Sequence, residues 1–244
     1  MHEDDHPEIS LSILLRLTAL TCSLLFFALP SFGVCLEPEQ TVACEFLNSD
    51  AVFVGTVTSA QTVPPRSKSP DEWVYDLAVQ ELFRGPRRKT IEVITENNSG
   101  RFPLDVGKKY LLFAYKFEGP LEIDNCGKSA LLPDAQEVLR ELRKLKIPKD
   151  ALIEGRISFS GIPDSGTHIP GIQIIIRGGG KTFKAKSDPE GWFHVHVPPG
   201  KYSADARQIP HWNIAPYDLS NDDPDHFRAR KGRCSSLQFV AQPN

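Results

Sequence analysis

Hydrophobic residues alternate with polar ones in short runs along most of the chain, a pattern typical of β-strands. The longest apolar run leads from Cys44 through a polar turn to Val57, and its β-branched and aromatic residues predict a buried strand. Gly55 lies inside this run and predicts a bulge or a sharp bend. The stretch 60–72, rich in proline, serine and charged residues, predicts a hairpin loop after the strand.

Three further strands are predicted in the first half of the chain. The runs 73–80, 90–95 and 109–115 are apolar or alternate in polarity. In the first of them, one face is expected to lie in the core: Trp73, Tyr75, Leu77 and Val79. Short strands separated by regular turn signals predict an all-β barrel or sandwich.

One helix is predicted over 134–146. Asp134 and Glu137 have the spacing of a capping box, and Pro148 ends the pattern. Apolar residues recur at helical spacing: Ala135, Val138, Leu139, Leu142 and Leu145. This stripe predicts that the helix packs on the barrel, so we expect the first domain to span 34–148.

A second domain is predicted over 150–242, where the strand patterns continue without a helical one. The predicted strands are 151–159, 171–180, 181–187, 192–197, 201–206 and 236–241. The segment 209–232 is interpreted as a long loop before the last strand. Six short strands favour a small β-sandwich.

The first 33 residues have the features of a signal peptide. Leu17–Leu29 is an apolar run too short to span a bilayer comfortably, Arg16 precedes it, and small residues at Ser31 and Gly33 suit cleavage after Gly33. We therefore expect a secreted, periplasmic or cell-surface protein. Attachment to a membrane is expected only if this segment is retained.

The charge balance gives no support for nucleic-acid binding. The chain carries 28 basic and 31 acidic residues, and one base and four acids lie in residues 1–33, so 27 of each remain. The basic clusters 84–89 and 140–146 are short and flanked by acidic residues. Solvated surface is the simplest interpretation of both clusters.

The cysteines predict a disulfide framework. Cys22 is expected to leave with the signal peptide, and four cysteines remain: Cys35, Cys44, Cys126 and Cys234. In an oxidising compartment, four cysteines predict two disulfides with three possible connectivities.

Four motifs of the first domain occur in a familiar order. They are Ser49-Asp-Ala-Val-Phe-Val-Gly-Thr-Val57 after Cys44, Val79-Gln-Glu-Leu-Phe-Arg-Gly85, Gly107-Lys-Lys-Tyr-Leu-Leu-Phe-Ala114, and Asn125-Cys126 before the helix. In this combination the domain resembles the netrin-like module, which includes the inhibitory domain of the tissue inhibitors of metalloproteinases. The resemblance implies a five-stranded OB-type barrel.

In those inhibitors a Cys-x-Cys pair opens the mature chain, and its first cysteine chelates the zinc of the protease. Cys35 matches the second cysteine, but Gly33 stands at the position of the first, which argues against zinc chelation. The resemblance also implies a Cys35–Cys126 disulfide. Cys44 is then left with Cys234, as a staple between the domains, and Cys44–Cys126 stays open as the alternative pairing.

The second domain also resembles a known module. The residues that carry this are Gly155-Arg-Ile157, Ile169-Pro-Gly-Ile-Gln-Ile174, Ser187-Asp-Pro-Glu-Gly-Trp-Phe193 and Pro198-Pro-Gly-Lys-Tyr202. They look like the carboxypeptidase regulatory-like, transthyretin-like β-sandwich, which is a non-catalytic accessory module. The expected fold class is therefore all-β: an OB-type barrel with one C-terminal helix, followed by a small β-sandwich.

Two histidines form a weak candidate metal site. His194 and His196 are two residues apart on one predicted strand, so they share a face, and such a pair can hold zinc or copper if a third ligand converges. The spacing suggests no third ligand, and the shared face lies opposite the predicted core. A solvated histidine pair is the simpler interpretation.

Two further clusters were weighed as ligand sites. Four acidic residues crowd the loop before the last strand: Asp218, Asp222, Asp223 and Asp225. They lack the glycine and the terminal glutamate of an EF-hand loop, so a solvated loop is expected. Trp192, Trp212 and Tyr217 could form an aromatic platform for a sugar or a peptide, against the simpler interpretation that they pack the loop on the sandwich.

No catalytic motif stands out: the chain has neither a Gly-x-Ser-x-Gly turn nor a glycine loop that leads into a helix. We expect an exported, non-enzymatic binding or scaffolding protein, without a cofactor, that acts through loops on two disulfide-stapled β domains. Its partner would be a protein or a glycan outside the cytoplasm, and the domain junction is the first place to expect a ligand. The alternatives are metalloproteinase inhibition by the N-terminal edge of the barrel, and a metal-dependent enzyme built on His194 and His196.

Overall fold

The computed structural model describes residues 40–64, 72–96, 100–116, 119–159, 168–217 and 223–243. The chain divides into two units, 1–34 and 35–244, and every described residue lies in the second. The predicted signal peptide and Cys35 fall outside the described residues. Within them, strands dominate and the predicted all-β fold class is confirmed.

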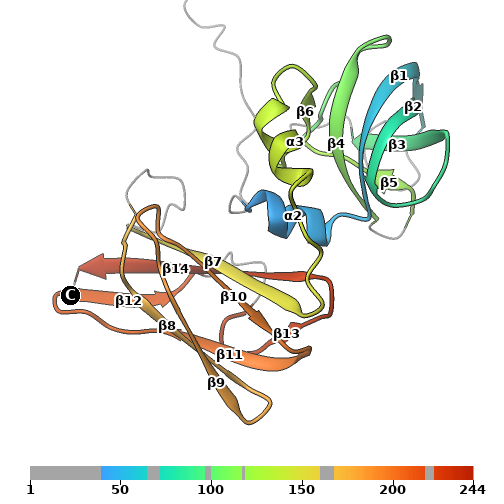
Figure 1. Ribbon diagram of the computed structural model, residues 1–244. Helices are drawn as coiled ribbons and strands as arrows, with labels where there is room; N and C mark the ends of the chain where they lie inside the picture. The colour runs from blue at the N-terminus through green and yellow to red at the C-terminus, as the bar shows by residue number, and fades with distance from the viewer. Residues whose placement is uncertain are drawn as a thin grey trace, which may run out of the picture. The chain divides into compact units, whose positions relative to one another are not determined.

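The first half of the described chain forms a closed barrel (Figure 1). Its strands are β1 (Ala51–Val63), β2 (Glu72–Arg84), β3 (Thr90–Glu96), β4 (Lys109–Lys116), β5 (Leu121–Glu122) and β6 (Ala130–Leu131). The sheet order is β1-β2-β3-β5-β4-β6, and β1 also pairs with β4, so five strands close a ring. This is the five-stranded barrel that was predicted, with β6 added beside β4.

Strand β1 pairs with both β2 and β4, because it is long and bent. Its pairing with β2 shifts register at three places, one of them between Val54 and Gly55. The predicted irregularity at Gly55 is therefore present. A Cβ atom at Gly55 would lie 3.2 Å from the Cβ of Leu77, so glycine also permits a close approach of the two strands.

A short helix, α2 (Val42–Asn48), precedes the barrel, where the sequence pattern predicted a polar turn. The oxygen of Thr41 caps the helix by accepting a hydrogen bond from the backbone N–H of Cys44. Val42, Phe46 and Leu47 are buried against the barrel. The segment from Cys44 to Asn48 is thus helical, which corrects the prediction of a polar turn before the strand.

Helix α3 (Gln136–Leu142) is shorter than the predicted helix over 134–146, and its predicted capping box does not form. The backbone N–H groups of Asp134 and Ala135 both bond to the carbonyl of Leu131, so this stretch is a turn and the helix begins after it. The predicted packing is confirmed, because Leu139 and Leu142 are buried in a cluster with α2, β1 and β4.

The second half of the described chain forms a sandwich of two four-stranded sheets. Its strands are β7 (Ala151–Phe159), β8 (Gln173–Gly178), β9 (Lys181–Lys186), β10 (Trp192–Val197), β11 (Gly200–Ala206), β12 (Trp212–Pro216), β13 (Phe227–Ala229) and β14 (Cys234–Pro243). One sheet has the order β10-β7-β14-β12 and the other β13-β11-β8-β9. In the first sheet β14 runs parallel to β7, and all other pairs in the sandwich are antiparallel.

The sandwich has two strands more than predicted. Segment 209–232 was interpreted as a loop, but it contains β12 and β13, which border one sheet each. Both strands are short, and each buries few apolar side chains, so the alternation in the sequence is too brief to identify them. The last strand also starts two residues earlier than predicted, at Cys234.

Three apolar clusters hold these elements together. One fills the sandwich and a second fills the barrel. The third joins α2 and α3 to β1 and β4, and it also includes Leu152 of β7 and Cys234 of β14. Because this third cluster draws on both halves of the chain, it is the structural basis of the site described below. No helix in the described ranges has both the length and the apolar character needed to cross a membrane.

Candidate functional site

A disulfide joins α2 to the first residue of β14. Cys44 and Cys234 are 190 residues apart in sequence, and their α-carbons are 5.1 Å apart. The predicted staple is confirmed, and the alternative Cys44–Cys126 pairing is excluded. Cys126 is itself disulfide-bonded. Its predicted partner, Cys35, lies outside the described residues, so that pairing stays a prediction.

The residue beside the staple binds the end of α2. The last carbonyl groups of a helix lack partners within the helix. The Arg233 guanidinium donates to the carbonyl of Asn48 at 2.6 Å and to the carboxylate of Asp50 at 3.0 Å. The backbone N–H of Cys234 donates to the side-chain oxygen of Asn48 at 3.0 Å. These bonds and the disulfide fix the start of β14 to α2.

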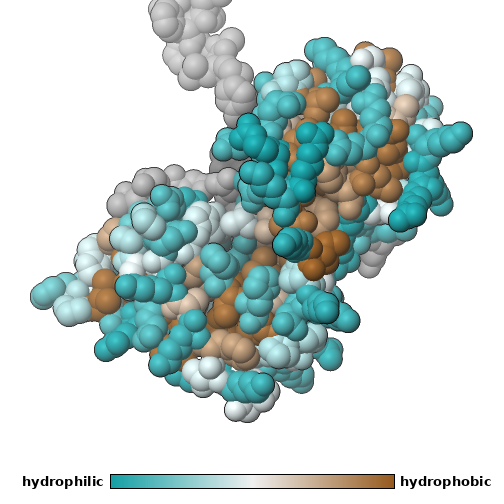
Figure 2. All heavy atoms as spheres, viewed as in Figure 1, coloured by the Kyte–Doolittle hydropathy of each residue, from teal (hydrophilic) through white to brown (hydrophobic). Residues whose placement is uncertain are grey.

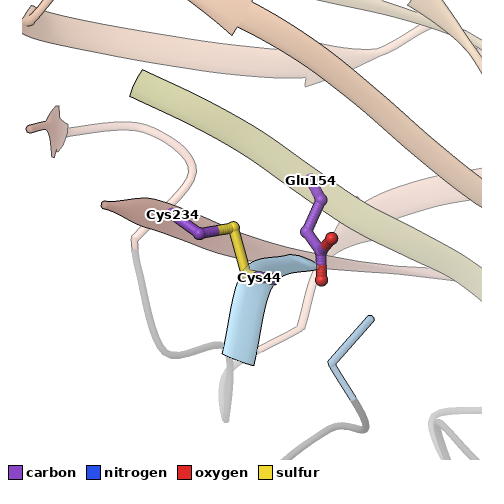
Figure 3. A group of neighbouring side chains, drawn as sticks. All are labelled: Cys44, Glu154 and Cys234. Carbon is purple, nitrogen blue, oxygen red and sulfur yellow. A yellow bond between two sulfur atoms is a disulfide. The ribbon is translucent and has the colours of Figure 1, made fainter. Parts of the chain in front are cut away.

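A buried carboxylate lies next to the disulfide. Glu154 of β7 is only 1% exposed. Its carboxylate accepts one hydrogen bond from the backbone N–H of Thr41, at 3.0 Å, and another from the Thr41 hydroxyl. Burial raises the pKa of Glu154, although both hydrogen bonds from Thr41 act to lower it. Figure 3 shows this carboxylate beside the two bonded sulfurs.

The same group has the composition of a metal site. One ligand atom each from Cys44, Glu154 and Cys234 lies within 4.8 Å of the others. Metal binding by cysteine requires thiolates. The two sulfurs are bonded to each other, so in its oxidised form the group holds a structural staple rather than a metal.

A second buried carboxylate fixes α2 to the barrel. Glu45 is 3% exposed and accepts hydrogen bonds from the Tyr115 hydroxyl at 2.9 Å and from the backbone N–H of Lys128 at 2.8 Å. Burial raises the pKa of Glu45, with both hydrogen bonds opposing the shift. A Cβ at Gly127 would lie 2.3 Å from the Glu45 carboxylate, so glycine makes room for it. Neither Glu45 nor Glu154 is predicted from the sequence as a site residue.

Helix α2, the segment after α3, β7 and β10 line a mostly apolar groove of about 290 Å³, and one of its lining residues, Glu154, lies beside the staple. Three groups of residues line it: Ala43, Phe46 and Leu47 of α2; Leu145, Ile147 and Pro148 after α3; and Leu152, Trp192, His194 and His196 of β7 and β10. Figure 2 shows hydrophobic side chains reaching the surface where Figure 1 places α2 and the segment after α3. The junction is where the sequence led us to expect a ligand.

The two candidate histidines lie at this groove. His194 and His196 are exposed on β10, and His194 is the register partner of Glu154 on β7. In the part of the chain that the structure describes, three potential metal ligands converge only at Cys44, Glu154 and Cys234. Neither histidine belongs to that group. The two histidines therefore line the groove, but no third metal ligand converges on them among the described residues.

The three candidate aromatic residues do not meet in one platform. Trp192 is on β10 and Trp212 on β12, the two opposite edges of a four-stranded sheet. Trp212 packs edge-on against Phe159, with ring centres 4.5 Å apart. Tyr217 follows β12, and its backbone N–H donates to the carbonyl of Gln238. The simpler interpretation holds for Trp212, whereas Trp192 lines the groove.

The acidic loop gives no site. Asp223 and Asp225 are exposed on the segment before β13, whereas Asp218 and Asp222 lie outside the described residues. The Asp223 carboxylate accepts a hydrogen bond from the backbone N–H of Asp225 at 2.9 Å, a local turn contact. The carboxylates that matter at the groove come instead from Glu154 and, at its rim, Glu141.

Comparisons with known proteins place the chain in no family. No family model matches it, and no curated protein matches it. Among solved structures, the TIE protein of Bacillus anthracis is 14% identical, with a TM-score of 0.27, over 79% of this chain and 34% of that chain. The major pilin T-13 of Streptococcus pyogenes is 10% identical, with a TM-score of 0.18, over 82% of this chain and 91% of that chain.

This chain thus spans about a third of the length of the Bacillus anthracis protein. At TM-scores this low, neither similarity supports an argument about fold or function. The function has to be inferred from the site itself.

Proposed function

We propose that this protein is an exported, non-enzymatic binding protein and that the groove at the stapled junction is its binding site. The observation that carries the proposal is one apolar groove lined by α2, the segment after α3, β7 and β10, beside a disulfide that joins α2 to β14. Ligand sites are usually concave and mostly apolar, with a few polar groups at fixed positions. A stapled groove keeps its shape without a partner, which lowers the entropic cost of binding.

The occupant that fits this groove best is an apolar segment of a protein partner. Ile147 is 62% exposed and lines the groove together with other apolar residues, so they form one apolar contact surface. The groove is also lined by groups that ionise or hydrogen-bond: Glu141, Lys146, His194 and His196. An apolar centre with a polar rim is the usual organisation of a protein–protein interface.

A glycan is a poorer fit for the same groove. Sugar rings commonly stack on an open aromatic face, and Trp192 is the aromatic residue of the groove that lies nearest the surface. The Arg156 guanidinium lies 4.9 Å from the centre of the Trp192 ring and occupies one of its faces. That face of the ring is therefore not open for stacking by a sugar.

Several observations support the family relationships and the compartment that form part of this proposal. Disulfides persist in oxidising compartments, which supports export. The ring order β1-β2-β3-β5-β4 supports an OB-type, netrin-like barrel. For the carboxypeptidase regulatory-like module, support comes from two turns: the Asp188 carboxylate accepts from the N–H of Trp192, and the Tyr202 hydroxyl donates to the carbonyl of Pro198.

A peptide-display selection on the purified protein tests the proposal. We expect the wild type to enrich peptides with aromatic or aliphatic anchors. Those peptides should lose at least about tenfold affinity for Ile147→Asp, because a truncated or charged anchor at an interface typically costs that much. Val106→Asp is the matched control, since Val106 is 59% exposed on a barrel loop outside the groove.

Two outcomes would overturn the proposal. One is a selection that enriches no sequence. The other is a set of peptides that bind Ile147→Asp as tightly as the wild type while losing affinity for Val106→Asp.

A further inference from the structure

The outer face of the second sandwich sheet is strongly basic. Ile174 and Ile176 of β8 point into the sandwich core, so the residues between and beside them point outward. The same alternation holds on the other strands of this sheet. Five exposed cations share the outer face: Arg177 on β8, Lys184 and Lys186 on β9, Lys201 on β11 and Arg228 on β13. We refer to these five residues as the basic face.

Few carboxylates balance the basic face. On the described strands of this sheet, the outward-pointing carboxylate is Asp205 of β11, and it is paired with Arg177. Asp223 and Asp225 precede β13, in a segment that runs along the side of β11 away from β8, since the N–H of Ala204 bonds to the carbonyl of Pro224. The excess positive charge therefore lies toward β8 and β9.

Basic hollows extend the face at both ends of β11. At one end, Lys186 and Arg207 line the same hollow. At the other, Arg228 lines a hollow with Arg230 and Lys231. Strand β11 has seven residues, so the track between the hollows is about 23 Å long.

A structural role does not account for this arrangement. Lysines on an edge strand such as β9 prevent edge-to-edge pairing, and Arg177 is paired with Asp205, but Lys201 lies on the interior strand β11. Lys201 and Arg228 are direct register partners. Like charges placed opposite each other across two strands destabilise a sheet, so this pair costs stability that an external anion would recover.

We propose that the basic face binds an acidic polysaccharide, recognising its carboxylate or sulfate groups by charge. A nucleic acid is less favoured, because nonspecific single-strand binding relies on aromatic stacking, and the outward positions of the described strands of this sheet hold no aromatic residue. Tyr202, Phe183 and Phe227 all pack toward the core. The inference does not depend on the groove or on its occupant.

The test uses three defined probes, immobilised heparin, polygalacturonate and oligothymidylate, with the full-length protein in about 50 mM salt, where charge-driven binding is strong. The test variant is the triple substitution Lys184→Gln, Lys186→Gln and Lys201→Gln. The matched control removes three charges that are also exposed, from the barrel: Arg87→Gln, Arg88→Gln and Lys89→Gln. Thermal melts confirm that both variants fold.

We expect the wild type and the control to bind at least one polysaccharide, with affinity that falls as salt rises. The triple variant should lose at least about tenfold affinity and show a weaker salt dependence. Failure of the wild type to bind either polysaccharide would overturn the proposal, and so would an equal loss in the control, which would mean nonspecific attraction. Tighter binding to oligothymidylate than to both polysaccharides would reassign the face to nucleic acid.

Discussion

Glu154 of the first sandwich strand accepts hydrogen bonds from both the backbone N–H and the hydroxyl of Thr41, 113 residues earlier in the chain. Thr41 is also the residue that caps α2. The hydroxyl thus accepts from the helix and donates to the carboxylate. One threonine therefore links the start of α2 to a buried carboxylate of β7, beside the disulfide that joins α2 to β14.

This buried carboxylate makes stability depend on pH. Burial raises the folded-state pKa of Glu154 above its ordinary value of 4.5. Between the ordinary and the raised pKa, the folded state binds more protons than the unfolded state, so the free energy of unfolding falls as pH rises through that range. Glu45 has a raised pKa for the same reason and adds to the effect.

We predict that Glu154→Gln is less sensitive to this change of pH. In denaturant unfolding, the wild type should have a lower free energy of unfolding at neutral pH than at pH 4.5. In the variant this difference should be smaller. The control is Glu190→Gln, which removes an exposed carboxylate in the turn before β10 and should keep the wild-type dependence. Equal dependence in wild type and Glu154→Gln would contradict the assignment.

Removing the staple should weaken the whole fold. The double substitution Cys44→Ala and Cys234→Ala opens a loop of 190 residues and leaves no free thiol at either site. We expect unfolding to lose about 2–5 kcal/mol. The unfolded chain should also expose more surface, so the denaturant slope m should rise. An unchanged midpoint and an unchanged m would show that the bond does not constrain the chain.

Helix α3 offers a test of packing. Leu142 is 4% exposed, within the cluster that joins α2, α3 and the barrel. Leu142→Asp places a charge against apolar surface, and we expect it to cost more than about 2 kcal/mol. Glu137→Asp keeps the charge on the exposed side of the same helix and should change stability by less than about 0.5 kcal/mol. If both variants melt at the wild-type temperature, the helix is not packed there.

Gly155 tests how closely the sandwich strands approach. A Cβ at this position would lie 2.3 Å from the carbonyl oxygen of Leu237 and 2.4 Å from the ring of Phe193. We expect Gly155→Ala to cost about 1–3 kcal/mol through overpacking. Gly119→Ala is the control, because no atom lies within 4 Å of its added Cβ. Calorimetry of the two variants compares them, and equal melting temperatures would rule out the close approach.

The parts of the fold that could be predicted depend on patterns within a few neighbouring residues. The alternation of Trp73, Tyr75 and Leu77 identifies a core face, and the structure packs all three in the barrel. The staple could be predicted because the resemblance to the inhibitors set Cys44 apart and one cysteine, Cys234, remained for it. The junction then followed as the place to look for a groove.

What could not be predicted depends on contacts between distant residues. In the sequence, Glu154 occupies an outward-facing position of an alternating strand. In the structure it is buried and contacts Thr41, which is distant in the sequence. Helix α2 had a signal that was missed, since Thr41 is a favourable capping residue with Val42, Phe46 and Leu47 close behind it.

The basic face was hidden for a similar reason. Arg177, Lys184 and Lys186 lie close together in the sequence, but Lys201 and Arg228 are separated from them by stretches that contain acidic residues, and the total charge nearly balances. Only the registers of three strands bring Arg177, Lys201 and Arg228 to one surface. The net charge describes the chain as a whole and therefore carries no information about where basic residues cluster on the surface.

The parallel pairing of β7 with β14 has a consequence for how the chain is made. A ribosome completes β7 at residue 159 and reaches β14 only at residue 234, a delay on the order of 4–15 s at ordinary rates of synthesis. During that interval the central strand of one sheet has an open edge, and Cys44 has no access to its partner. The nascent sandwich therefore needs protection from aggregation until β14 has been synthesised. The Cys44–Cys234 disulfide can form only after that point.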